Sequence, residues 1–168
     1  MNSDELRAMQ APLKDQYKQA PDAALITLKA QGKIGQGITC KVETGRALAV
    51  AGLHPASGGD GLSLCSGDML LEALVACAGV TLNAVATAIG VTLRDATVFA
   101  EGDLDFRGTL GVSKEAPVGF RAIRLRFDLD TDATAEQIAS LLKLTERYCV
   151  VLQTLKNPAQ ISAEMKKV

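Results

Sequence analysis

The sequence contains no tryptophan and a single histidine, and it has no excess of charge of either sign. Aromatic residues make up 4% of its 168 residues, and the formal net charge is −1, with an isoelectric point near 5.8. Proteins that bind nucleic acid or anionic membranes usually carry a basic surplus. The composition therefore predicts neither partner, and the length predicts one globular unit large enough to bury a core.

A signal peptide is also missing from the start of the sequence. The first ten residues, MNSDELRAMQ, are polar and acidic, whereas a signal peptide has a basic start followed by an apolar stretch. This predicts a cytoplasmic protein, in which cysteines stay reduced unless they are catalytic.

The cysteines lack the spacing of a metal site. Cys40, Cys65, Cys77 and Cys149 form no C-x-x-C pair, and His54 is the only histidine that could join them. Structural zinc sites need four such ligands at short spacings, so we expect no metal and no cofactor. Free thiols or a redox pair remain, and for Cys40 and Cys65 we expect the role of small, half-buried side chains.

The least polar stretch is LLEALVACAGVTLNAVATAIG, residues 70–90, which contains Cys77. Its length would suffice to span a membrane, but Glu72 and Asn83 would be costly there and strand-like segments flank it. We therefore predict a buried central helix that is capped by Ser66 or Asp68 and stopped by Gly90. A helix that is apolar nearly all round needs cover from several sides, which favours a dimer.

The rest of the chain reads as an α+β protein. A helical segment interrupted at Pro12 comes first, and strands follow at 24–30, 38–42 and 46–52, separated by turns such as GKIGQG. After the central helix come two strand regions, the second alternating apolar and charged residues. A capping box at Thr134 and Gln137 then starts a helical region with a break near Arg147 or Tyr148. Residues 159–168 read as a closing strand.

Three segments together resemble one protein family. The runs HPASGGDGLSLCSGDMLLEALVACAGVTLNAVA and ERYCVVLQTLKNPAQI resemble the two cysteine motifs of osmotically inducible protein C and the organic hydroperoxide resistance proteins. The run LKDQYKQAPDAALITLKAQGKIGQG resembles the N-terminal segment of one OsmC-like branch. The resemblance extends from about Leu13 to about Met165 and implies a single OsmC-like domain over 1–168. Within it, 1–22 would be a helical lead-in, 24–66 strands and a loop, and 67–168 the remainder.

The resemblance implies a thiol peroxidase in an intertwined homodimer, with antiparallel sheets packed on long central helices. By position, Cys77 would attack an organic hydroperoxide and Cys149 would resolve the resulting sulfenic acid as a disulfide. An external dithiol would reduce that disulfide, and a lipoyl group on a protein is the reductant that the family suggests.

Two further residues are candidates for activating Cys77. In active family members a glutamate and an arginine hold the thiolate; here Gly67 occupies the glutamate position, with Asp68 next to it, and Ile34 falls where the arginine aligns, with Lys33 beside it. Asp68 also fits a role in compensating the helix dipole, and Lys33 also fits a solvated turn. Both interpretations stay open for each residue.

A second function is compatible with the same motifs. Cys149 is followed by Val150-Val151-Leu152 where the family has proline, valine and serine. The chain could therefore be a non-catalytic OsmC-like protein that binds a small apolar ligand or senses oxidants.

Overall fold

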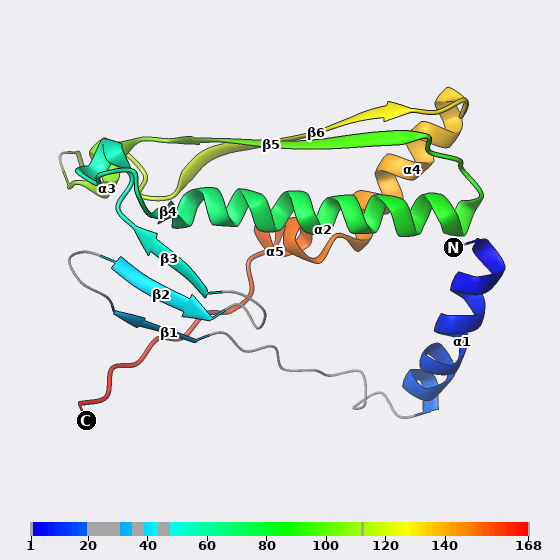
Figure 1. The fold of residues 1–168 in the computed structure, drawn as a ribbon, viewed down its shortest axis with the longest axis horizontal. Coiled ribbons are helices and arrows are strands. Elements are labelled where there is room, and N and C mark those ends of the chain that lie inside the picture. Colours follow the sequence, from blue (N-terminus) through cyan, green and yellow to red (C-terminus); the bar gives the residue numbers. More distant parts are fainter. Residues whose placement is uncertain (1, 20–30, 35–38, 44–47, 112, 168) are drawn as a thin grey trace.

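The long helix α2 (Ser66–Ile89) is the axis around which the other elements are arranged (Figure 1). The structure is a computed structural model, and it describes residues 2–19, 31–34, 39–43, 48–111 and 113–167. Helices and antiparallel strands are segregated along the chain, which confirms the α+β class. A single chain is present, so the predicted dimer stays a prediction.

Helix α2 begins and ends where backbone geometry changes. Cys65 is extended, with φ −82° and ψ 130°, and the helix starts directly after it, so Cys65 is the N-cap and the predicted caps at Ser66 and Asp68 are wrong. Gly90 ends the helix as predicted, with φ 73° and its N–H donated to the carbonyls of Ala86 and Thr87. Only glycine adopts this left-handed conformation without steric cost.

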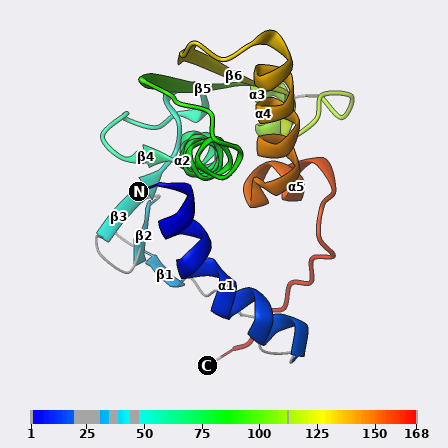
Figure 2. The ribbon, with the colours of Figure 1, turned by 90° about the vertical axis from the view of Figure 1, so that its right-hand side faces the viewer.

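A two-stranded sheet covers one side of α2. Strands β5 (Asp95–Leu104) and β6 (Phe120–Asp130) pair antiparallel, with Val98 opposite Phe127. As the alternation predicts, the apolar residues of β6 point towards α2, while Arg124 on the outer face pairs with Glu101 and Asp103. Figure 2, viewed along α2, shows this sheet on one side of the helix. Exposed ion pairs contribute little stability, so apolar packing on α2 holds the sheet in place.

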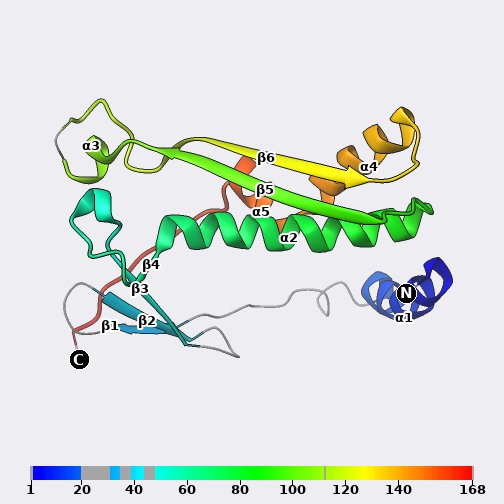
Figure 3. The ribbon, with the colours of Figure 1, turned by 45° about the horizontal axis from the view of Figure 1, so that its top comes forward.

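The N-terminal strands form a separate sheet near the start of α2 (Figure 3). Strands β1 (Gln31–Ile34), β2 (Thr39–Glu43) and β3 (Leu48–Gly52) make an antiparallel meander. A short 3₁₀ helix, η2 (Pro55–Ser57), follows, and β4 (Leu64–Cys65) pairs parallel to β3. The strand predicted at 24–30 lies outside the described residues. Strand β1 extends into the GKIG segment predicted as a turn, because its backbone pairs with β2 through Lys33 opposite Lys41.

Helices α4 (Ala135–Tyr148) and α5 (Val150–Lys156) pack on another side of α2. The predicted capping box is present: Thr134 accepts the N–H of Gln137, and the Gln137 side chain accepts the N–H of Thr134. Leu141 of α4 packs among Leu82, Val85 and Ala86, which joins the two helices in a common core. The break predicted near Arg147 or Tyr148 falls at the next residue, Cys149, between α4 and α5.

The ends of the chain differ from the predictions. Helix α1 (Ser3–Gln19) continues through Pro12, whose missing N–H removes only one helical hydrogen bond. A short helix, α3 (Phe106–Thr109), was not predicted; the Asp105 carboxylate caps it. Residues 158–167 form no strand, and no described strand of this chain pairs with them. The predicted closing strand is therefore wrong for the single chain.

Among the described residues, α2 is the one helix long and apolar enough to cross a membrane. It packs on β5, α4 and α5 instead, in the manner of a core helix. Its buried residues are Leu74, Ala78, Leu82, Val85 and Ala86, and they lie on one face. Other apolar positions of α2 remain uncovered in one chain, including Val80, whose exposure is 74%.

Candidate functional site: a thiol pair between two helices

Cys77 lies midway along α2, at the edge of an apolar cluster. It is half-buried and packs beside Leu74, Ala78 and Cys149. Ala78 and Gly79 follow it, so small residues surround this turn of the helix. The position leaves the sulfur partly accessible while most of the neighbouring surface is apolar.

Cys149 occupies the corner between α4 and α5. It has an extended backbone, with φ −73° and ψ 106°, and its side chain is completely buried. Its N–H donates to the Thr145 carbonyl at 3.0 Å, and its own carbonyl accepts the N–H of Gln153 at 2.9 Å. Cys149 therefore ends one helix and starts the next, and both cysteines are free thiols.

The start of α5 faces the Cys77 sulfur. Burial alone would raise the pKa of Cys77, but hydrogen bonds from the Val151 N–H, the Cys149 thiol and the Val150 N–H outweigh it and lower the pKa. The first N–H groups of a helix have no partner within that helix and carry partial positive charge. A thiolate at Cys77 is stabilised by these groups in the way that helix N-termini activate cysteines.

The Thr81 hydroxyl makes the smallest contribution to the Cys77 pKa. Thr81 has one hydroxyl proton, and its oxygen lies 2.7 Å from the Cys77 carbonyl, so that proton is mainly engaged by the carbonyl. Thr81 thus helps to hold the helix turn on which the sulfur sits.

The pKa of Cys149 is shifted in the opposite direction. Burial raises it, and the hydrogen bond and charge of Cys77 raise it further, while the N–H groups of Leu152 and Val151 offset part of the shift. The two thiols pack together, and their pKa values are shifted in opposite directions, so Cys77 ionises before Cys149. Such a pair suits a nucleophile and a second thiol that reacts later.

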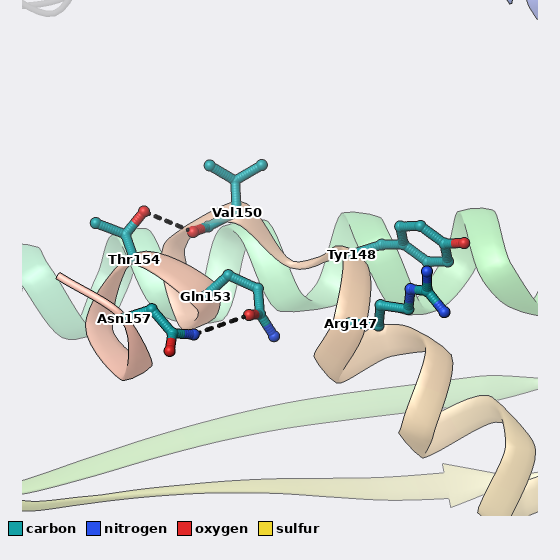
Figure 4. A pocket seen from close by; sticks show the side chains of 6 residues that line it. All are labelled: Arg147, Tyr148, Val150, Gln153, Thr154 and Asn157. Atoms are coloured by element: carbon teal, nitrogen blue, oxygen red, sulfur yellow. Dashed lines mark hydrogen bonds between the residues drawn. The ribbon is translucent and has the colours of Figure 1, made fainter. Parts of the chain in front are cut away.

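Side-chain contacts hold the corner between α4 and α5 in shape. The Gln153 amide donates to the Glu146 carbonyl at 2.7 Å, and Lys156 pairs with the Glu146 carboxylate at 3.1 Å. Figure 4 shows the outer side of this corner, where an open groove of about 430 Å³ is lined by six residues: Arg147, Tyr148, Val150, Gln153, Thr154 and Asn157.

A family model described as OsmC-like protein matches residues 58–164. This range includes Cys77, Cys149 and every helix and strand from β4 to α5. The chain belongs to the OsmC-like family. A search of curated proteins finds no match.

Solved structures of OsmC-like proteins share the fold. An OsmC-like protein from Mycoplasma pneumoniae aligns with a TM-score of 0.67 at 15% identity, over 79% of this chain and 89% of that one. Organic hydroperoxide resistance proteins from Legionella pneumophila and Elizabethkingia anophelis both align with a TM-score of 0.62, at 17% and 16% identity. They cover 79% and 80% of this chain and 91% of each of theirs. At these identities the likeness establishes the fold.

This OsmC-like chain does not bring Asp68 to Cys77. Asp68 is exposed in the first turn of α2, and nine helical residues place it about 13 Å along the axis and on the opposite face. It lines an open hollow with Glu72, Leu71 and Val75. Within one chain its position fits the compensation of the helix dipole, the simpler of the two interpretations.

Besides Lys33, Arg46 and Arg94 are two further basic residues of the chain that folding could bring to Cys77, and those that are described lie apart from the thiols. Lys33 lies on β1, and its side chain is outside the described part, as is Arg46. Arg94 pairs with Asp130 and Asp132 beyond the other end of α2. Within the described part of the chain, no lysine or arginine is among the groups that set the pKa of Cys77.

The other cysteines and the histidine are not part of the thiol pair. Cys65 is half-buried at the start of α2, and the side chain of Cys40 lies outside the described part. The His54 ring stacks on Phe106 with centroids 4.9 Å apart, and its Nδ1 accepts the Ala56 N–H at 3.0 Å. In the described ranges, no three His, Cys, Asp or Glu side chains gather as metal ligands.

The sequence interpretation missed the N–H groups of Val150 and Val151. Their backbone role depends on no side-chain identity, so no motif marks them. The helix break predicted beside Cys149 was the available signal, because a new helix starting there must present unbonded N–H groups.

Proposed function

We propose that this protein reduces organic hydroperoxides, using Cys77 as the attacking thiolate and Cys149 as the resolving thiol. The observation that carries the proposal is the packing of Cys77 beside Cys149 and the start of α5, where the N–H groups of Val151 and Val150 lower the pKa of Cys77. That contact supplies an ionised nucleophile and a partner thiol at the same place.

The first step transfers one oxygen atom. The Cys77 thiolate attacks an oxygen of the hydroperoxide, an S–O bond forms and the O–O bond breaks, and the alkoxide takes a proton to leave as the alcohol. The sulfur is oxidised by two electrons to a sulfenic acid. The N–H groups of Val150 and Val151 favour the thiolate that starts this step.

The second step joins the two cysteines. The Cys149 thiolate attacks the Cys77 sulfur, an S–S bond forms, and the oxygen leaves as hydroxide and becomes water. An external dithiol then reduces the disulfide by exchange, and a lipoyl group on a protein would suit this role. The cycle needs no metal and no bound cofactor.

The assembly and location form part of the same proposal. In one chain Val80 is 74% exposed and Leu70 and Ile89 are partly exposed, so α2 has apolar surface available for a second copy. We propose a homodimer in the cytoplasm. The apolar neighbours of Cys77, among them Leu74 and Leu152, favour organic hydroperoxides over hydrogen peroxide. The relatives from L. pneumophila and E. anophelis bear the name organic hydroperoxide resistance protein, which supports this substrate class.

A second candidate function is slow oxidant sensing by the same thiol pair. It is favoured by the lack of a described lysine or arginine among the groups acting on Cys77, since a guanidinium would both stabilise the thiolate and orient the peroxide. A sensor would form the same disulfide at the rate of an ordinary thiol.

Stopped-flow oxidation separates the two functions. The reduced protein is mixed with cumene hydroperoxide, tert-butyl hydroperoxide or hydrogen peroxide, and free thiols are counted over time. For a peroxidase we expect the loss of two thiols per chain with the organic peroxides, at least a hundredfold faster than for a free cysteine. Oxidation no faster than free cysteine would contradict the peroxidase and favour the sensor.

Cysteine variants assign the roles. Cys77→Ser should abolish the rapid phase, and Cys149→Ser should stop at a sulfenic acid that dimedone traps. Cys65→Ser is the matched control, because Cys65 is also a free, half-buried thiol. It is the N-cap of α2, whereas Cys77 lies midway along the helix. It should react like the unmodified protein.

A further inference from the structure

Thr145 carries a buried hydroxyl without a partner. Its exposure is 1%, and among the described residues it is the one buried polar side chain. In the same part of the chain its Oγ1 is the one buried side-chain oxygen or nitrogen that makes no hydrogen bond. A buried hydroxyl without a hydrogen bond lowers the stability of the fold, so an unpaired one in a native core needs a physical reason.

Other threonines in the helices satisfy their hydroxyls locally. Thr81, Thr87 and Thr154 each donate to the carbonyl four residues earlier, at 2.7, 2.8 and 2.9 Å. The equivalent acceptor for Thr145 is the carbonyl of Leu141, and Thr145 makes no such bond. Its hydroxyl is therefore available for an acceptor other than its own helix.

The position of Thr145 relates it to the thiol pair. It lies one turn before Cys149 on α4, and side chains four residues apart in a helix are neighbours on the same face. Helical side chains also lean towards the preceding turn, so the Cys149 side chain leaves its Cα on the side of the turn that carries Thr145, although the two side chains are not hydrogen-bonded in the dithiol state. Leu141 packs against Leu82 and Val85, and Cys149 packs against Leu74 and Ala78, so Thr145 faces α2 between these two contacts.

We propose that the Thr145 hydroxyl donates a hydrogen bond to the Cys149 thiolate when that thiolate forms, and so acts as a positioning residue for disulfide formation. The inference rests on the proposed function and refines it. In the step concerned, the Cys149 sulfur gives an electron pair to the Cys77 sulfur, an S–S bond forms, and the group carried by Cys77 leaves with its bonding pair.

The surroundings of Cys149 explain why such a donor is needed. Cys149 is completely buried, and its proton must leave before it can attack. The N–H groups of Leu152 and Val151 approach it from α5, and Thr145 adds a donor from the α4 side. In the dithiol state Cys149 is a neutral thiol, and the Thr145 hydroxyl makes no hydrogen bond to its sulfur. The proposed bond forms by rotation of the Thr145 or Cys149 side chain once the thiolate is present.

The test measures Cys149 as a nucleophile without any peroxide. In a chain with Cys40→Ser and Cys65→Ser, 4,4′-dithiodipyridine reacts with Cys77 and releases one thiopyridone. Cys149 then attacks the Cys77 sulfur and releases a second thiopyridone, which absorbance records in stopped flow. The rate of the second release is measured across pH for the background chain, Thr145→Val and Thr145→Ser.

We expect Thr145→Val to slow the second release about tenfold at neutral pH and to move its pH midpoint up by about one unit, with the first release unchanged. Thr145→Ser, which keeps the hydroxyl, should stay close to the background chain. A purely structural hydroxyl predicts a different result: Thr145→Val raises the melting temperature, because an unpaired polar group is removed, and leaves both releases unchanged.

Equal second-release rates in Thr145→Val and the background chain would overturn the inference, as would equal slowing in Val and Ser variants or no second release at all. The proposed function fails separately, if organic hydroperoxides oxidise the protein slowly while the second release with dithiodipyridine depends on Thr145 as expected.

Discussion

Val151 packs in the same cluster as Cys77, and its backbone N–H lowers the pKa of the Cys77 thiol, so the first turn of α5 faces a thiol in the middle of α2. The contact places partial positive charge beside Cys77 through the peptide backbone. A donor of this kind keeps its position as long as the corner at Cys149 keeps its shape. The reactivity of Cys77 therefore depends on how α4 and α5 pack against α2.

The alkylation of Cys77 should begin at a lower pH than that of an unfolded cysteine. Its pKa is lowered in the fold, so the thiolate fraction is larger below the ordinary thiol pKa. Monobromobimane labelling across pH, with the labelled residue identified by mass spectrometry, measures the midpoint. The same chain in guanidinium is the control, and a midpoint equal to or above the control would contradict the thiolate assignment.

Reduction of the disulfide should start at Cys77. Attack on Cys149 would expel the better leaving group, because Cys77 has the lower pKa, but Cys149 is completely buried while Cys77 is half-buried. Access decides the outcome, since an incoming thiolate must reach the sulfur. Treatment of the oxidised chain with glutathione, acid quenching and peptide mapping should find the mixed disulfide on Cys77. Adducts mainly on Cys149 would show that the corner opens before reduction.

Leu141→Ala should destabilise the protein by about 2–5 kcal/mol. Leu141 is completely buried where α4 packs on α2, so the substitution leaves a cavity. Leu142→Ala is the matched control, because Leu142 is the next residue and is 45% exposed; its cost should stay below about 1 kcal/mol. Urea unfolding measures both, and similar losses would argue against the packing of α4 described above.

Gln153→Leu should loosen the corner between α4 and α5. It removes the bond from the Gln153 amide to the Glu146 carbonyl, which contributes about 1 kcal/mol, and it leaves that carbonyl without this donor. The N–H groups of Val150 and Val151 would then be held less firmly against Cys77, so the midpoint of Cys77 alkylation should rise.

Thr154→Ala controls for the Gln153 substitution, since Thr154 is exposed on the same helix and donates only to the Val150 carbonyl. It should change neither the midpoint nor the stability by a measurable amount. An unchanged midpoint in Gln153→Leu would mean that α5 keeps its place without this bond.

Local patterns predicted much of the fold. The apolar run with its glycine stop became α2, the alternation after Phe120 became β6, and the pair Thr134 and Gln137 formed a capping box. Each of these depends on neighbours within a few residues. The closing strand at 159–168 was wrong because a strand depends on a pairing partner, which a local pattern does not contain.

For the site, local sequence patterns were enough to predict the thiols at Cys77 and Cys149, the helix break beside Cys149 and the α+β order of elements. The folded chain was needed to show that the start of α5 packs beside Cys77, that Cys149 is buried against it, and that Asp68 lies on the far face of α2. These relations depend on how three helices pack against one another. Packing is set by the summed contacts of residues far apart in the chain, which no short motif records.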